Sequence, residues 1–220
     1  MATRPPLDPD STINSPNEDA NSTLTSRRDL LLGAVSMVAA TAVPASAANP
    51  SGAAAAIPPS PTAKAAWHAF EVSLAEALAD LDEDEFLTIS PKGSNRFVQF
   101  LDQGAHGIRM ETTSNVYLTG TERLSGSARR RLPAIGWHEP TSGSDEGTGP
   151  SLVDIEGSSN YFRDAPRPVP FPVLARIVAA TFREFSIGLP GELEYDSGSV
   201  EDPDVALKFP ALGLKRARRS

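Results

Sequence analysis

The sequence predicts a single α+β domain in which helices flank an antiparallel sheet. Three short extended runs follow one another between residues 86 and 117, and turn residues separate them. Short connections force neighbouring strands to run antiparallel, so we expect a three-stranded meander. A meander alone cannot bury its apolar face. Helical patterns precede and follow it in the sequence, and these helices are expected to cover that face.

The meander shows the two-residue alternation of half-buried strands. Its runs cover residues 86–90, 96–101 and 108–117, and turns at 91–95 and 102–107 separate them. In the second run, Val98 and Phe100 face one side, whereas Phe97, Gln99 and Leu101 face the other. In the third run Arg109 alternates with the apolar Ile108 and Met110. The Arg109 side chain is therefore expected on the exposed face, away from the core.

Helical spacing appears in three other segments. The apolar stripe of the first helix consists of Trp67, Phe70, Leu74, Ala77, Leu78 and Leu81. A short helix is expected at residues 122–132, where Pro133 would stop it. A long helix is expected to open at Pro170 or Pro172 and to end near Gly188. Further strands are expected at residues 151–155 and 160–162, with a last short piece at 192–195.

The N-terminus has the three parts of an export signal. Arg27 and Arg28 precede an apolar run at residues 30–43, and the small residues Ala45, Ser46 and Ala47 follow it. The run is shorter than the roughly 20 residues of a spanning helix. The pattern resembles a twin-arginine (Tat) signal with cleavage after Ala47. We expect a secreted or cell-envelope protein that meets a membrane only through this signal. A cytoplasmic protein with an accidental Arg-Arg pair is the alternative.

These patterns predict four regions. Residues 1–47 form the signal with its disordered leading part, 48–61 a linker, 62–196 the folded domain and 197–220 a disordered tail. The net charge of −8 argues against a nucleic-acid surface, which needs a basic footprint. The chain has no cysteine, which excludes disulfides and thiolate chemistry. Its three histidines lack a paired metal spacing, so no cofactor or metal is expected.

Catalysis finds little support in the sequence. His68, His106 and His138 are the only imidazoles, and no G-x-S-x-G nucleophile elbow or phosphate-binding loop occurs. The acidic run at residues 82–85 lacks the spaced pattern of a calcium loop. We therefore expect a protein that is not an enzyme. A hydrolase with an unrecognised site remains the alternative.

Several segments resemble the TY-Chap group, which takes in actinobacterial relatives of the type III secretion chaperones and of YbjN. The resemblance rests on segments 97–100, 110–118, 135–137, 160–162, 180–183 and 193–195. It implies the α-β-β-β-α-β-β-α order of the secretion chaperones. It also implies binding of a protein or peptide partner. Relatives of this fold often pair, so a homodimer, or a purely structural dimerisation module, is a further expectation.

The expected binding surface is the sheet. An extended peptide can add to a sheet edge, and a partner helix can lie in a groove beside it. The candidate contact residues are Phe97, Gln99, Leu101, Arg109 and Tyr117. For each of them, ordinary core or solvated surface is the competing interpretation.

Overall fold

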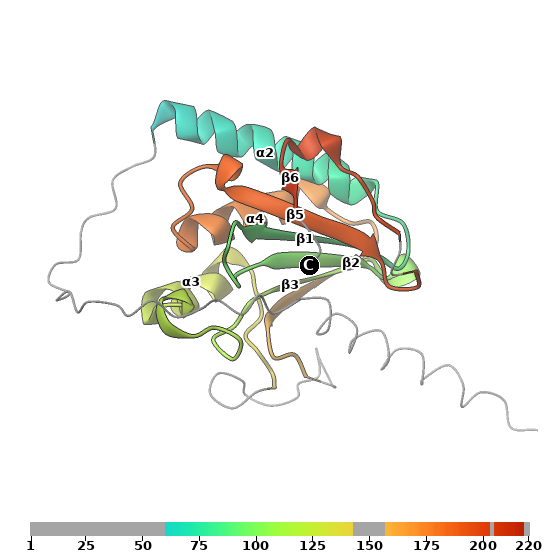
Figure 1. The fold of residues 1–220 in the computed structure, drawn as a ribbon. Coiled ribbons are helices and arrows are strands. Elements are labelled where there is room, and N and C mark those ends of the chain that lie inside the picture. The colour runs from blue at the N-terminus through green and yellow to red at the C-terminus, as the bar shows by residue number, and fades with distance from the viewer. Residues whose placement is uncertain (1–59, 143–156, 203–204, 218–220) are drawn as a thin grey trace, which may run out of the picture. The chain divides into compact units, whose positions relative to one another are not determined.

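The computed structural model describes residues 60–142, 157–202 and 205–217. The export signal, residues 48–59 of the linker and the strand expected at residues 151–155 lie outside these ranges. The described chain confirms the α+β prediction, with a six-stranded sheet and three α-helices (Figure 1). No helix among the residues that it describes is long and apolar enough to cross a membrane.

The sheet is built around the predicted meander. The strands are β1 (Glu85–Pro91), β2 (Val98–Asp102), β3 (Ile108–Thr112), β4 (Tyr161–Ala165), β5 (Leu193–Ser199) and β6 (Lys215–Arg216). Their order across the sheet is β4-β3-β2-β1-β5-β6. Every neighbouring pair is antiparallel except β5 and β6, which run parallel. The third run of the meander ends at Thr112, earlier than the predicted residue 117.

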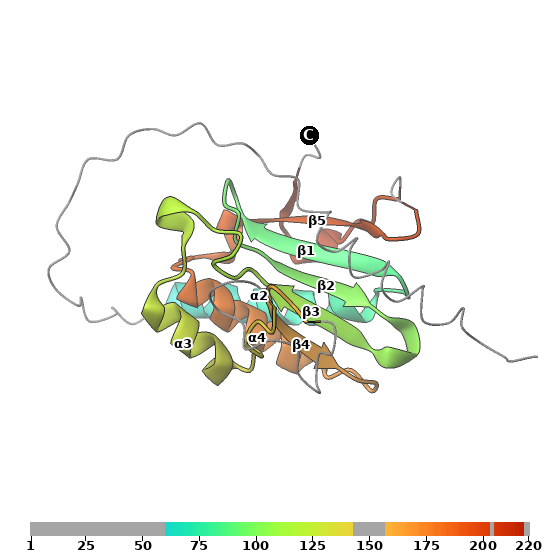
Figure 2. The same ribbon diagram turned by 90° about the horizontal axis from the view of Figure 1, so that it is seen from below.

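The helices α2 (Pro61–Ala79), α3 (Gly126–Ile135) and α4 (Phe171–Glu184) lie on one side of the sheet (Figures 1 and 2). Buried helix residues such as Leu74 and Phe182 share one core with Leu87, Phe100 and Met110 of the strands. Burial of this apolar area is the main favourable contribution to folding. The layered arrangement leaves the opposite sheet face without a helix from the described part of the chain.

Local sequence explains where α2 begins and which face it buries. Ser60 caps the helix, because its hydroxyl accepts a hydrogen bond from the Ala63 amide at 3.2 Å, and Pro61 suits the first turn. The helix therefore begins at Pro61, the last residue of the predicted linker. Its predicted stripe is buried, with Trp67 donating a hydrogen bond from Nε1 to the carbonyl of Gly188 at 3.1 Å.

The short helix α3 corrects the predicted stop at Pro133. Ser125 caps its start, and Pro133 lies inside the helix. Pro133 has no amide hydrogen to donate to the carbonyl of Arg129, and the helix ends two residues later, at Ile135. Gly136 then closes it with a φ of +121°, donating its amide to the carbonyls of Leu132 and Pro133.

The C-terminal segment is the largest difference from the prediction. Residues 197–220 were expected to be disordered, but β5 continues to Ser199, and residues 205–217 pack on the domain. Phe209 and Leu212 are buried in the core, and the Phe209 amide donates to the Tyr195 hydroxyl at 3.2 Å. The short piece expected at residues 192–195 is thus the start of a seven-residue strand that pairs with β1 along its whole length.

Candidate functional site

The helix-free face of the sheet carries two cross-strand rows of side chains. One row runs from Phe86 of β1 through Leu101 and Arg109 to Asp164 of β4. The second row contains Thr88, Gln99, Glu111 and Phe162. Residues directly opposite each other on antiparallel strands lie close enough for their side chains to touch. We call this set of eight residues, together with Phe97, the open sheet face.

Apolar groups occupy much of the open sheet face. Phe86, Phe97, Leu101 and Phe162 are buried there, yet they do not belong to the core that the helices share with the sheet. A sheet face that only meets water would alternate to polar side chains at such positions. This face is therefore suited to contact with another apolar surface.

The prediction that Arg109 is exposed is wrong. Arg109 is 2% exposed, and its guanidinium lies over the Phe162 ring at 4.7 Å from the ring centre. Its Nε donates to Glu111 Oε1 at 2.9 Å, and its Nη1 lies 3.3 Å from both carboxylate oxygens of Asp164. The side chain does leave the helix-side core, as its alternation with Ile108 and Met110 required. Its charge is compensated by carboxylates and an aromatic ring instead of by water.

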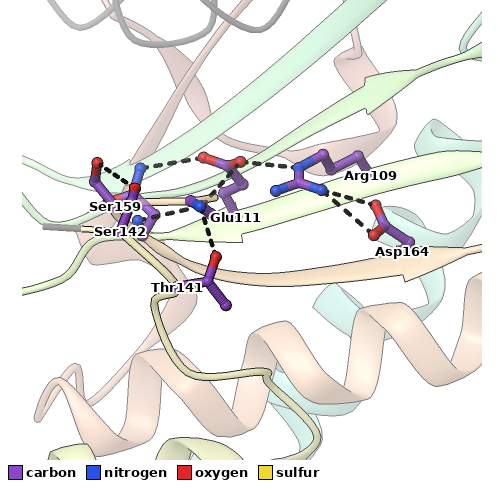
Figure 3. Close-up of polar contacts among 8 residues, drawn as sticks. Arg109, Glu111, Thr141, Ser142, Ser159 and Asp164 are labelled. Atoms are coloured by element: carbon purple, nitrogen blue, oxygen red, sulfur yellow. Dashed lines mark hydrogen bonds and ion pairs between the residues drawn. The ribbon is translucent and has the colours of Figure 1, made fainter. Parts of the chain in front are cut away.

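Glu111 connects Arg109 to the segments on either side of residues 143–156 (Figure 3). Its Oε2 accepts from Asn160 Nδ2 at 3.1 Å, and its Oε1 accepts from the Ser158 hydroxyl at 3.5 Å. The Thr141 amide donates to the Ser158 carbonyl at 2.8 Å, and the Ser158 amide donates to Thr141 Oγ1 at 2.8 Å. This network has a structural role, because it joins β3 to these two segments and gives the buried carboxylate the hydrogen-bond donors that it needs.

The structure brings four of the five predicted contact residues together. Phe97, Gln99, Leu101 and Arg109 lie on the open sheet face, whereas Tyr117 lies in the loop after β3 and is 36% exposed. Phe86 and Phe162 were missed as members of this face. The strand register places them there, because Phe86 lies opposite Leu101 and Phe162 lies opposite Glu111.

The two sheet edges are occupied by the chain itself. Along β4, His138 and Phe162 exchange backbone hydrogen bonds of 2.8 and 3.2 Å, and Arg163 Nη1 donates to the Gly136 carbonyl at 2.7 Å. Along β5, the two-residue strand β6 pairs with Glu194 and Tyr195. A peptide that adds to either edge has to compete with these contacts.

The three histidines are all exposed, on α2, in the β2–β3 turn and beside β4. No group of three or more potential ligand side chains that could hold a metal ion occurs within residues 60–142, 157–202 and 205–217.

One family model matches the chain, at residues 60–199 of the 220. Its description is "T3SS (YopN, CesT) and YbjN peptide-binding chaperone 3", or TY-Chap3. The chain belongs to this family. The TY-Chap3 match ends at the last residue of β5, so the C-terminal segment with Phe209 and β6 lies beyond it. No curated protein and no solved structure matches the chain.

Proposed function

We propose that this TY-Chap3 domain binds an extended peptide segment of a partner protein on the open sheet face, without catalysing a reaction. The observation that carries the proposal is the combination of a peptide-binding family with a sheet face that carries four buried apolar side chains and has no described helix over it (Figure 2). Apolar burial supplies affinity without demanding one partner sequence, which suits a chaperone-like role.

Phe97, Gln99 and Leu101 are the proposed contacts at the centre of this surface. All three are already buried, so a partner segment has to compete with the contacts that shield them. Binding then depends on the difference between the two sets of contacts. Arg109 holds Glu111 and Asp164 in place at the border, where the pairing leaves Asp164 partly exposed.

The test introduces a charge at the β1 end of the open sheet face. Thr88 is half-buried and lies between Gln99 and Asp196 on the neighbouring strands. Thr88→Arg should weaken the binding of overlapping apolar peptides by about tenfold or more, because a bound apolar peptide would cover the added charge. Val72→Arg, at a position 49% exposed on α2, is the matched control. Equal fluorescence-anisotropy titrations for both variants would refute the proposed surface.

We further propose that the protein is exported. Arg27 and Arg28 in front of a short apolar run, with Ala45 and Ala47 at the small-residue site, support Tat-dependent export and cleavage after Ala47. Replacing both arginines with lysine should leave the full-length precursor in the cytoplasm, as seen by immunoblotting of cell fractions. Secretion of the double variant at the wild-type level would rule out the twin-arginine assignment.

We also propose that the protein forms a homodimer, because related folds often pair. Sedimentation velocity over a range of concentrations should reveal a species of twice the chain mass. If that species forms and Thr88→Arg abolishes it, the open sheet face pairs with a second copy instead of a peptide.

A further inference from the structure

We propose that the outer edge of β5 is a second binding site, specific for basic extended peptides, and that β6 occupies it in the resting protein. The inference rests on the proposed peptide-binding function and adds a ligand class and a cis-acting competitor. The ligand would lie parallel to β5 and pair with its backbone as an added strand.

The first observation is that β6 is a minimal strand. It forms ladder pairs with Glu194 and Tyr195, two of the seven residues of β5. The Ala217 amide extends this pairing by donating to the Tyr195 carbonyl at 2.7 Å. In contrast, β1 pairs with β5 from Glu85 to Pro91. Few backbone hydrogen bonds therefore hold β6, and such segments open locally at low free-energy cost.

The second observation is charge complementarity between the edge and its occupant. Residues 192–202 contain five acidic residues and no lysine or arginine, whereas residues 215–219 read Lys-Arg-Ala-Arg-Arg. In the structure, Arg216 Nη2 lies 3.4 Å from Asp196 Oδ1 and donates to the Ser197 carbonyl at 3.1 Å. The occupant of the edge thus shows directly which chemistry fits it.

The third observation is that the fit of β6 is imperfect. Arg216 Nε is buried, and no hydrogen-bond acceptor meets it among the described residues. A buried donor without an acceptor costs stability. The Arg216–Asp196 ion pair is also partly exposed, with 29% and 25% of the two side chains accessible, so it adds little. A better-fitting basic peptide can therefore displace β6.

The extent of the family match agrees with this assignment. The TY-Chap3 match ends at residue 199, the end of β5, so β6 lies outside the matched domain. Short, basic edge strands also serve to prevent aggregation. The two roles differ in one property, because a protective strand need not yield to a peptide in trans.

The test uses the full chain and a synthetic peptide with the sequence of residues 214–220, Leu-Lys-Arg-Ala-Arg-Arg-Ser. Ala217→Pro removes the amide that donates to Tyr195, whereas Ala217→Gly keeps it and is the matched control. A tethered competitor acts at a high effective concentration. Ala217→Pro should therefore bind the peptide about tenfold or more tightly than Ala217→Gly does.

A second peptide separates strand pairing from charge attraction. It carries N-methylalanine at the position of Ala217, which removes the same amide hydrogen and leaves every charge in place. This peptide should bind Ala217→Pro about tenfold more weakly than the unmodified peptide, because backbone pairing is lost. Equal dissociation constants for the two peptides, or for the two protein variants, would overturn the proposal.

Amide hydrogen exchange of the wild-type chain gives an answer even if Ala217→Pro does not fold. The Ala217 amide should exchange on the order of a hundredfold faster than the amides of β1, since β6 must open while the sheet stays intact. Equal protection would refute a displaceable strand. The edge test changes Ala217 and leaves Thr88 as it is, so failure here and failure of the open sheet face are distinguishable.

Discussion

At the scale of single residues, Arg109 is the most informative side chain of the domain. The strand alternation correctly predicts that its side chain lies on the other face of the sheet from Ile108 and Met110. The alternation does not predict whether that face is exposed to solvent or buried. Of the groups that contact it, Glu111 lies on the same strand, whereas Asp164 and the Phe162 ring lie on β4. The two β4 residues are more than 50 residues away in the sequence, so the local sequence pattern cannot predict these contacts.

Truncating Arg109 should therefore destabilise the protein strongly. Arg109→Ala leaves Glu111 buried with less compensation, which should lower the free energy of unfolding by about 3–5 kcal/mol. Asp164→Asn is the control, because the Asp164 side chain is 41% exposed and its ion pair should contribute less than about 1 kcal/mol. Urea denaturation followed by circular dichroism measures both values. Equal losses for the two variants would contradict the buried assignment.

Phe182 tests the helix side of the same sheet. It is fully buried in the last turn of α4. Phe182→Ala should cost about 3–5 kcal/mol, because a large cavity remains. Val72→Ala, on the exposed side of α2, should change stability by no more than about 0.5 kcal/mol. A Phe182→Ala melting temperature close to that of wild type would show that the core can refill the space.

At the scale of elements, the sequence predicts those helices and strands that local residues determine. It fails where contacts between residues far apart in the sequence determine the structure. The helices α2 and α4 and the strands β1, β2 and β3 were predicted, because caps, turns and hydrophobic periodicity are local in the sequence. The full length of β5 was missed because its second half, with Asp196 and Gly198, lacks apolar alternation. Pairing with β1, over 100 residues earlier, makes that half a strand.

The C-terminal segment was missed for a related reason. Its composition is acidic and then basic, which is typical of disorder. Two of its side chains are buried in the core, and Leu207 and Leu214 pack against that core. Phe209 packs with Tyr195 at a ring-centre distance of 6.2 Å, and Leu212 is buried nearby. A few apolar residues in a charged segment are enough when a site on the domain accepts them.

Phe209→Ala measures how firmly this segment belongs to the domain. Loss of a ring that is 7% exposed should lower the free energy of unfolding by about 3–5 kcal/mol. The neighbouring Lys208 is exposed, so Lys208→Ala should stay within about 0.5 kcal/mol of wild type. If both variants unfold at the same urea concentration, residues 205–217 do not contribute to the core.

At the scale of the whole molecule, the two tryptophans connect distant parts of the described chain to the long helix. Trp67 of α2 donates to the Gly188 carbonyl just after α4. Trp137, after α3, donates from Nε1 to Thr181 Oγ1 within α4 at 2.8 Å. Both rings are buried in the single core that also contains the strands. One core shared by all the helices favours one cooperative unfolding transition.

The chain contains only these two tryptophans, so each can be observed alone. Trp137→Phe leaves Trp67 as the reporter, and Trp67→Phe leaves Trp137. Within each variant, the urea transition measured by tryptophan fluorescence should coincide with the one measured by far-ultraviolet circular dichroism, because α2, α3 and the sheet lose their contacts together. Midpoints are compared within a variant, since each substitution shifts stability by itself. A Trp67 transition at lower urea than the circular dichroism transition would show that α2 separates first, and that the helical layer and the sheet are not one cooperative unit.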